Sequence, residues 1–204
     1  MTYAQAKLWA QKWHWYERNR RPIRKARIHL HAMRDGFFVR FPIEGNVLEA
    51  LDDGRLTIGR GSLLEPSCWI TIAEQGRVRI GDGCFLNIGT MVACRDEVTI
   101  GDHVMFANGC FVSDASHRFD DPETPVTWQG FTSKGPTQIG SNCWFGLNCV
   151  VTTGVTVGER CVIGANSVVT RDLPPRTICA GAPAKVIREI DYVTPKDDVS
   201  AAAT

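Results

Sequence analysis

Apolar residues recur at every sixth position through most of the chain beyond residue 57. The longest series runs without interruption from Ile139 to Val169, and three shorter series begin at Ile58, Ile80 and Ile100. A period of six matches neither the turn of an α-helix nor the simple alternation of a long strand. It predicts one short strand and one corner per repeat, with one inward side chain in each, so that three repeats close a triangular coil.

Coils of this kind stack into a parallel β-helix, in which each coil hydrogen-bonds to the next and buries a column of aliphatic side chains. We therefore expect a mainly β fold of about five coils, beginning near Ile58, Ile80, Ile100, Ile139 and Val157. The third and fourth starts are 39 residues apart, which exceeds one 18-residue coil by 21. The excess, at residues 117–136, is expected to form a loop that projects from the column.

This pattern divides the chain into three segments. Residues 1–50 are expected to form a basic and aromatic N-terminal segment that is partly helical. Residues 51–190 form the β-helix with a short closing segment at its C-terminal end, and residues 191–204 form a flexible tail. The length of 204 residues and the 44% content of hydrophobic residues suit one globular domain.

Cysteine is concentrated at one position of the repeat. Six of the eight cysteines stand four residues after an inward aliphatic residue. We expect them to be compact apolar fillers, because free cysteine is commonly buried. Cys143 and Cys161 are 18 residues apart and should stack in adjacent coils, but a reducing compartment disfavours a disulfide. The chain has no paired C-x-x-C spacing that would indicate zinc.

Charge is distributed unevenly along the chain. The net charge is +1, yet residues 1–40 hold ten Lys and Arg against two Asp and Glu, which is +8, and the remainder is 13 − 20 = −7. The average gives no reason to expect a nucleic-acid partner. No stretch has the roughly 20 apolar residues that span a bilayer, and the first residues lack a signal-peptide core, so we expect a cytoplasmic protein.

The N-terminal residues 1–27 combine aromatic and basic side chains and support two interpretations. They could form an interfacial helix that contacts anionic lipid, which would place the protein at the inner face of the membrane. Alternatively, they form a helix whose aromatic side chains pack on the first coil or on a neighbouring subunit.

Several motifs together resemble the hexapeptide-repeat acyltransferase family, especially the galactoside and maltose O-acetyltransferases, over residues 56–190. They are the six-residue repeat, His117 at the edge of the loop, the run Ile139–Gly146 and the ending Gly181–Arg188. The segments 116–125 and 129–135 resemble the members that modify polysaccharides. This resemblance implies a left-handed β-helix, a homotrimer with active sites between subunits, acetyl-coenzyme A as co-substrate, a saccharide acceptor and no metal.

The expected reaction, acetyl transfer from a thioester to a sugar hydroxyl, needs a base that removes the hydroxyl proton as the oxygen attacks the carbonyl. A neutral imidazole suits this task, and of the five histidines His117 is the one in a site-like context. A base also needs a partner that orients its ring. Four nearby side chains and any backbone carbonyl remain open as that partner; the side chains are those of Asp114, Ser116, Asp120 and Asp121.

The resemblance also implies which residues bind the two substrates. Asn87 and Asp114 are expected at the acceptor, whereas Arg95 stands where relatives carry an acidic acceptor contact. The residues expected at coenzyme A are Trp144, Ala165, Thr170, Arg171, Lys185 and Arg188.

Three alternative functions fit parts of the sequence. The acceptor could be an amine, which would make the protein an N-acetyltransferase for an amino-sugar nucleotide or a drug. The same fold hosts γ-type carbonic anhydrases, but their zinc site needs a second histidine near the first, and residues 112–122 contain only His117. A catalytically silent scaffold is disfavoured by His117 and its intact loop.

Overall fold

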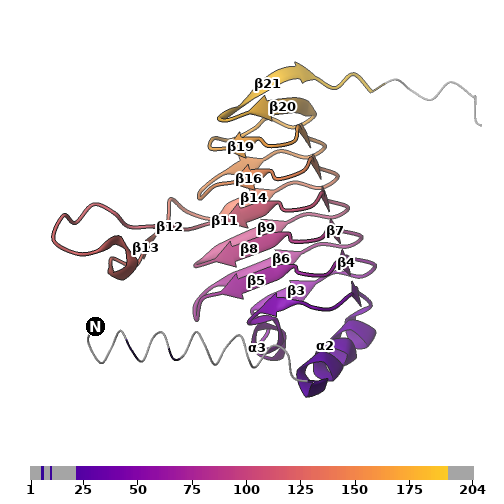
Figure 1. Ribbon diagram of the computed structural model, residues 1–204. Coiled ribbons are helices and arrows are strands. Elements are labelled where there is room, and N and C mark those ends of the chain that lie inside the picture. Colours follow the sequence, from indigo (N-terminus) through magenta and orange to yellow (C-terminus); the bar gives the residue numbers. More distant parts are fainter. Residues whose placement is uncertain (1–5, 7–9, 11–21, 193–204) are drawn as a thin grey trace, which may run out of the picture.

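The computed structural model shows a tapering column of stacked coils with helices at one end and an arm projecting from its side (Figure 1). It describes residues 6, 10 and 22–192. The column has three walls, which we name sheets A, B and C, and their strands are parallel except for the last strand of sheet A. Strands of the three walls alternate along the chain in the order C, A, B, so that three successive strands form one coil.

The strands of each wall follow one another up the column in chain order. Sheet A contains β1 (Phe38–Val39), β4 (Leu63–Leu64), β7 (Phe85–Leu86), β10 (Met105–Phe106), β15 (Trp144–Phe145), β18 (Val162–Ile163), β20 (Thr177–Gly181) and β21 (Ala184–Glu189). Sheet B contains β2 (Glu44–Gly45), β5 (Trp69–Ile72), β8 (Met91–Cys94), β11 (Phe111–Ser113), β16 (Val150–Val151) and β19 (Val168–Val169). Sheet C contains β3 (Leu56–Ile58), β6 (Arg77–Ile80), β9 (Glu97–Ile100), β14 (Thr137–Ile139) and β17 (Thr156–Val157).

The predicted β-helix is confirmed. The five expected starts are the last residues of the five sheet C strands, which pair in register from Ile58 through Ile80, Ile100 and Ile139 to Val157. Partial turns precede the first coil and follow the last, giving about six turns in all, consistent with the left-handed coil that the resemblance implies. At the C-terminal end β21 folds back antiparallel on β20 and closes sheet A.

Columns of inward side chains fill the interior, as the six-residue period predicts. Phe106 and Phe145 are fully buried and stack in adjacent coils with ring centroids 4.8 Å apart. The N-terminal end of the column is covered by α2 (Pro22–Asp35) and α3 (Val47–Asp52), with Ile28 and Ala32 of α2 buried. The guanidinium of Arg24 on α2 pairs with Glu49 on α3, which joins the two helices.

The loop between the third and fourth coils projects from the column, as expected. It leaves after β11 and contains β12 (Ser116–His117), a 3-10 helix (Val126–Trp128) and β13 (Phe131–Thr132). The strands β12 and β13 pair antiparallel, so the loop is a hairpin-based arm (Figure 1). Most of the predicted N-terminal segment 1–27 and of the tail 191–204 lies outside the described residues, so lipid contact stays a prediction. No helix of residues 22–192 is long and apolar enough to cross a bilayer.

The cysteines are buried fillers, and they also have a polar role that the sequence did not indicate. All eight are free. The thiol of Cys84 donates to the Gly101 carbonyl at 3.0 Å, and that of Cys149 donates to the Gly164 carbonyl at 3.1 Å. Ser62, at the equivalent position of another coil, donates to the Gly81 carbonyl at 2.8 Å. A small donor at this position therefore satisfies a carbonyl at a corner of the next coil.

Burial should make these thiols unreactive in the folded protein. It raises the pKa of Cys68 to about 12 and that of Cys94 to about 12. A hydrogen bond from the stacked thiol of the adjacent coil instead lowers the pKa of Cys149 to about 7 and that of Cys161 to about 6, so these two are protected by their burial alone. Because a reagent must reach the sulfur to react with it, we expect native protein at pH 8 to react with a disulfide reagent roughly 100-fold or more slowly than protein unfolded in urea. All eight thiols should titrate in urea. A thiol that reacts rapidly in the native protein would contradict this packing.

Candidate functional site

His117 lies at the base of the arm, where the chain leaves the third coil. Its backbone pairs with Phe131 across the hairpin, and the two rings lie 4.4 Å apart between centroids at an angle of 37°. The His117 side chain is exposed and makes no hydrogen bond to any residue in the described part of the chain. The aromatic contact fixes one face of the imidazole, while both ring nitrogens stay available to a ligand or to solvent.

The arm base is tied to the coil that follows it. Thr153 lies after β16 in the fourth coil, and its hydroxyl donates to the carbonyl of Asp114. The same hydroxyl accepts a hydrogen bond of 2.9 Å from the backbone N–H of Lys134. One side chain therefore bridges the outgoing and the returning strand of the arm, which holds His117 at a fixed place beside sheet B.

A groove of about 270 Å³ opens beside His117, between the outer face of sheet B and the arm. Its lining residues are Thr71, Ala73, Ala93, Cys94, Arg95, Phe111, Ser113, Ala115, Ser116, His117 and Phe131. Small and aromatic side chains form its walls, and Arg95 supplies a permanent charge. The volume is slightly below the roughly 300–1,000 Å³ of small-molecule sites, so the groove has room for one sugar-sized unit.

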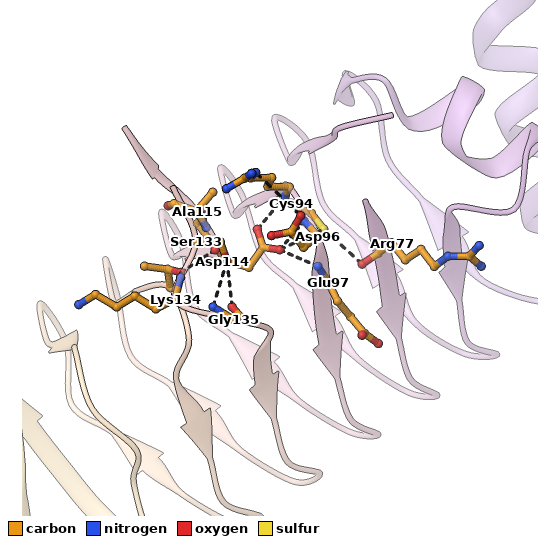
Figure 2. A network of polar contacts seen from close by, with 12 residues as sticks. Arg77, Cys94, Asp96, Glu97, Asp114, Ala115, Ser133, Lys134 and Gly135 are labelled. Carbon is orange, nitrogen blue, oxygen red and sulfur yellow. Dashed lines mark hydrogen bonds and ion pairs between the residues drawn. The ribbon is translucent and has the colours of Figure 1, made fainter. Parts of the chain in front are cut away.

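Asp114 lies between Ser113 and Ala115, which line this groove, and its side chain contacts the corner of the neighbouring coil (Figure 2). Its fully buried carboxylate accepts backbone hydrogen bonds from Arg95 at 2.7 Å, Asp96 at 2.7 Å and Glu97 at 2.6 Å. These three amides belong to the corner of the coil below. Both Asp114 oxygens thus accept backbone hydrogen bonds, and the acceptor contact expected of this residue stays a prediction.

The other expected partners of His117 are also engaged elsewhere or lack a contact to it. Asp120 accepts hydrogen bonds of 3.0 and 3.1 Å from Arg118, which lowers the pKa of Asp120. Asp121 has its pKa lowered by hydrogen bonds from Thr124 and from the backbone of Glu123. In residues 22–192 no hydrogen bond links these side chains, Ser116 or a backbone carbonyl to the imidazole. The ring contact with Phe131 is the interaction that orients the imidazole within the described residues.

A second group of predicted residues lies at the corner between sheets A and B. Asn87 follows β7, and its side-chain oxygen accepts a hydrogen bond of 2.8 Å from the N–H of Ile88. Trp144 on β15 is 50% exposed on the outer face. Ala165 follows β18 and is exposed, and its N–H donates no backbone hydrogen bond within residues 22–192. Lys185 pairs with Ala180 on the closing hairpin and is exposed.

The other residues predicted to bind coenzyme A lie at the corner between sheets B and C and on the closing hairpin. Thr170 and Arg171 are exposed and follow β19, so they lie at the corner between sheets B and C, two coils beyond the arm base. Arg188 pairs with Ile178 at the closing hairpin. The two edges of sheet B are separated by its strands, and the four residues of β8 alone span about 13 Å. Within one chain, therefore, Asn87 and His117 do not face the same space.

The outer faces of the three walls differ in polarity. On sheet A the paired outward residues form an apolar column of Phe38, Leu63, Phe85, Met105, Trp144, Val162 and Ile178. Sheet B carries a similar column of Trp69, Met91, Phe111, Val150 and Val168. Sheet C instead presents Thr57, Arg79, Thr99, Gln138 and Thr156. Apolar columns of this extent are typical of surfaces that another protein surface covers.

Sequence reasoning missed some groove residues. The six-residue period identifies Phe111 and Ala93 only as members of the repeat. Their positions in the strands point outward, and that alternation could have indicated that they line an outer surface.

In the part of the chain that the structure describes, no group of three or more His, Cys, Asp or Glu side chains is placed to hold a metal ion.

Comparison with known proteins connects this architecture to acetyltransferases. A family described as the hexapeptide repeat of succinyl-transferase matches residues 136–171. A probable acetyltransferase of Mycobacterium tuberculosis is 36% identical over 132 residues, which are 61% of this chain and 44% of that protein. The galactoside O-acetyltransferase of Escherichia coli is 34% identical over 135 residues, covering 66% of this chain and 64% of the other. The chain thus spans less than two thirds of the length of these curated relatives.

A solved structure extends the match. The hexapeptide-repeat-containing acetyltransferase of Vibrio cholerae, complexed with acetyl-coenzyme A, is 32% identical. The alignment covers 72% of this chain and 78% of that one, with a TM-score of 0.60.

Proposed function

Because this chain belongs to the hexapeptide-repeat acetyltransferase family, we propose that it transfers an acetyl group from acetyl-coenzyme A to a hydroxyl of a saccharide. The observation that carries this proposal is His117 at the rim of a sugar-sized groove, exposed and free of competing hydrogen bonds within residues 22–192. The relative with bound acetyl-coenzyme A and the galactoside O-acetyltransferase support the donor and the acceptor class.

In the proposed reaction, the neutral imidazole of His117 accepts the proton of the acceptor hydroxyl. The oxygen attacks the thioester carbonyl carbon, forming a C–O bond and a tetrahedral intermediate. Collapse of this intermediate breaks the C–S bond, and the imidazolium returns its proton to the leaving coenzyme A thiolate. The products are the acetyl ester and free coenzyme A, and the base is regenerated. Contact with Phe131 helps to hold the imidazole in the orientation that this transfer needs.

We further propose a homotrimer with sites in the clefts between copies. Two observations support it: the apolar outer columns of sheets A and B, and the location of Asn87 and Trp144 on the opposite edge of sheet B from His117. A second copy would bring the Asn87 edge of one chain to the His117 edge of the next. Coenzyme A would then contact the six residues named for it: Trp144, Ala165, Thr170, Arg171, Lys185 and Arg188.

The groups proposed for coenzyme A have chemistry that suits its parts. The exposed Trp144 ring offers an apolar surface to the pantetheine arm, and the Ala165 N–H offers a donor to its amides. Arg171, Lys185 and Arg188 are exposed cations near the C-terminal end, which suits the phosphates. The eight free thiols suit a reducing compartment and support a cytoplasmic location.

The proposed activity is tested by incubating the full chain with acetyl-coenzyme A and a panel of sugars, amino sugars and nucleotide sugars. Thiol release and mass spectrometry of the acceptor are followed together. The proposal expects acceptor-dependent release and an acetyl ester that is cleaved by mild base. An acetyl amide that survives mild base would establish N-acetylation instead, and acceptor-independent release would indicate hydrolysis.

A further inference from the structure

The lining of the groove beside His117 carries a positive charge and no carboxylate. Arg95 is the one permanently charged residue among those that line it, and the other walls are small, aromatic or hydroxyl-bearing. The carboxylate of Asp114 is fully buried against backbone N–H groups, so it does not face the groove with a free oxygen. A ligand in this groove therefore meets a cation with no carboxylate on the lining to balance it.

The Arg95 guanidinium is available for a ligand. It donates no hydrogen bond to any residue of the described chain, and its charged neighbour is Asp96, with 3.9 Å between Nε and the carboxylate oxygen. Both side chains are about half exposed, at 44% and 50%, and Asp96 does not line the groove. Such an exposed ion pair contributes little and yields readily to a competing anion.

A structural role does not account for this arginine. Arg55, at a neighbouring corner, donates to the carbonyls of Ile72 and Ala73 at 3.0 and 2.9 Å and pairs with Asp53. Arg95 makes no comparable bond to any residue within 22–192. Its backbone, by contrast, is held by Asp114 at 2.7 Å, so the side chain starts from a fixed point on the groove lining.

We propose that Arg95 determines acceptor specificity and that the groove takes a sugar unit carrying an anionic group, either a carboxylate or a phosphate. This inference rests on the proposed function and narrows its substrate class. The planar guanidinium would bind two oxygens of the anion as a fork, which also orients the ring in the groove. The apolar walls, including Phe111 and Phe131, would contact the sugar ring while its hydroxyl points to His117.

The test compares three acceptors that differ in one group: methyl glucoside, methyl glucuronoside and methyl glucoside 6-phosphate. Each is assayed with native protein, Arg95→Gln, Arg95→Lys and the control Arg79→Gln, an exposed arginine on sheet C outside the groove. We expect native protein to favour at least one anionic acceptor over the neutral one by about tenfold in kcat/KM. Arg95→Gln should abolish that preference through KM, with kcat nearly unchanged, and Arg95→Lys should restore part of it.

Binding of the same three compounds is measured by calorimetry with the same proteins, to separate this inference from the proposed function. An Arg95-dependent preference in binding, without acetyl transfer to these compounds or to any acceptor of the wider panel, would support the inference and refute the proposed function. Acetyl transfer with equal use of neutral and anionic acceptors, unchanged in Arg95→Gln, would overturn the inference and leave the function standing. The inference is also overturned if neither binding nor transfer depends on Arg95. Comparison of methyl glucuronoside with methyl glucoside 6-phosphate shows whether the groove prefers a carboxylate or a phosphate.

Discussion

Replacement of His117 by alanine is expected to lower kcat for acetyl transfer by about 10²- to 10⁴-fold, the usual contribution of a general base. KM for acetyl-coenzyme A should change little, because the ring is proposed to act on the acceptor proton. The His117 side chain is exposed and makes no hydrogen bond within the described residues, so the folded structure should not depend on it. Initial rates and the unfolding midpoint are measured on the same preparation.

A matched control comes from His103, which lies at an exposed corner with φ of 56° and away from the groove. His103→Asn keeps a residue that tolerates this backbone conformation, and it should leave the rate unchanged. If His117→Ala retains the native rate, the general-base assignment is wrong. If it loses coenzyme A binding or folding as well, its role is structural.

Replacement of Asp114 by alanine is expected to destabilise the protein by about 3–5 kcal/mol, because it leaves three backbone donors without their charged acceptor. The midpoint of urea unfolding should fall, at equal protein concentration, with little change in slope. The stability of Asp114→Asn should lie between those of the native protein and Asp114→Ala, because the amide oxygen of asparagine can still accept a hydrogen bond.

The control for Asp114 is Asp96→Ala, which removes a half-exposed carboxylate from the same corner. Surface changes of this kind usually alter stability by less than about 0.5 kcal/mol. A loss below about 1 kcal/mol in Asp114→Ala would contradict a stabilising role for these hydrogen bonds. An active, stable Asp114→Ala enzyme with altered acceptor KM would instead favour the direct acceptor contact that the resemblance implies.

Much of the fold could be predicted because each coil repeats the same local constraint. One inward aliphatic residue per six positions fixes the walls, and all five expected starts end strands of sheet C. The arm was predictable from arithmetic alone, since the spacing from Ile100 to Ile139 exceeds one coil. The spacing could not predict the pairing of Ser116–His117 with Phe131–Thr132, because the hairpin of the arm lies outside the six-residue repeat.

The site was only partly predictable because its groups are assembled by register between coils. Asp114 is three residues before His117, which suggested that it could orient the imidazole. Its side chain instead points to backbone groups 17 to 19 residues earlier in the chain. The spacing of the coils could have predicted this contact, because Ser113 pairs with Ala93 and Asp114 therefore lies beside Cys94 in the neighbouring coil. Likewise, the outer faces of sheets A and B are apolar and that of sheet C is polar, and this difference depends on the outward-facing residues of the strands. The six-residue repeat describes only the inward-facing residues.

Complementation between two inactive variants would show whether each active site is shared between two copies of the chain. His117→Ala and Asn87→Ala are co-expressed with different tags, mixed trimers are purified, and acetyl transfer is compared with each variant alone. If each site combines His117 of one copy with Asn87 of the next, every mixed trimer holds one intact site, which restores about a third of the native rate. Mixed trimers no more active than the separate variants would contradict a site shared between copies.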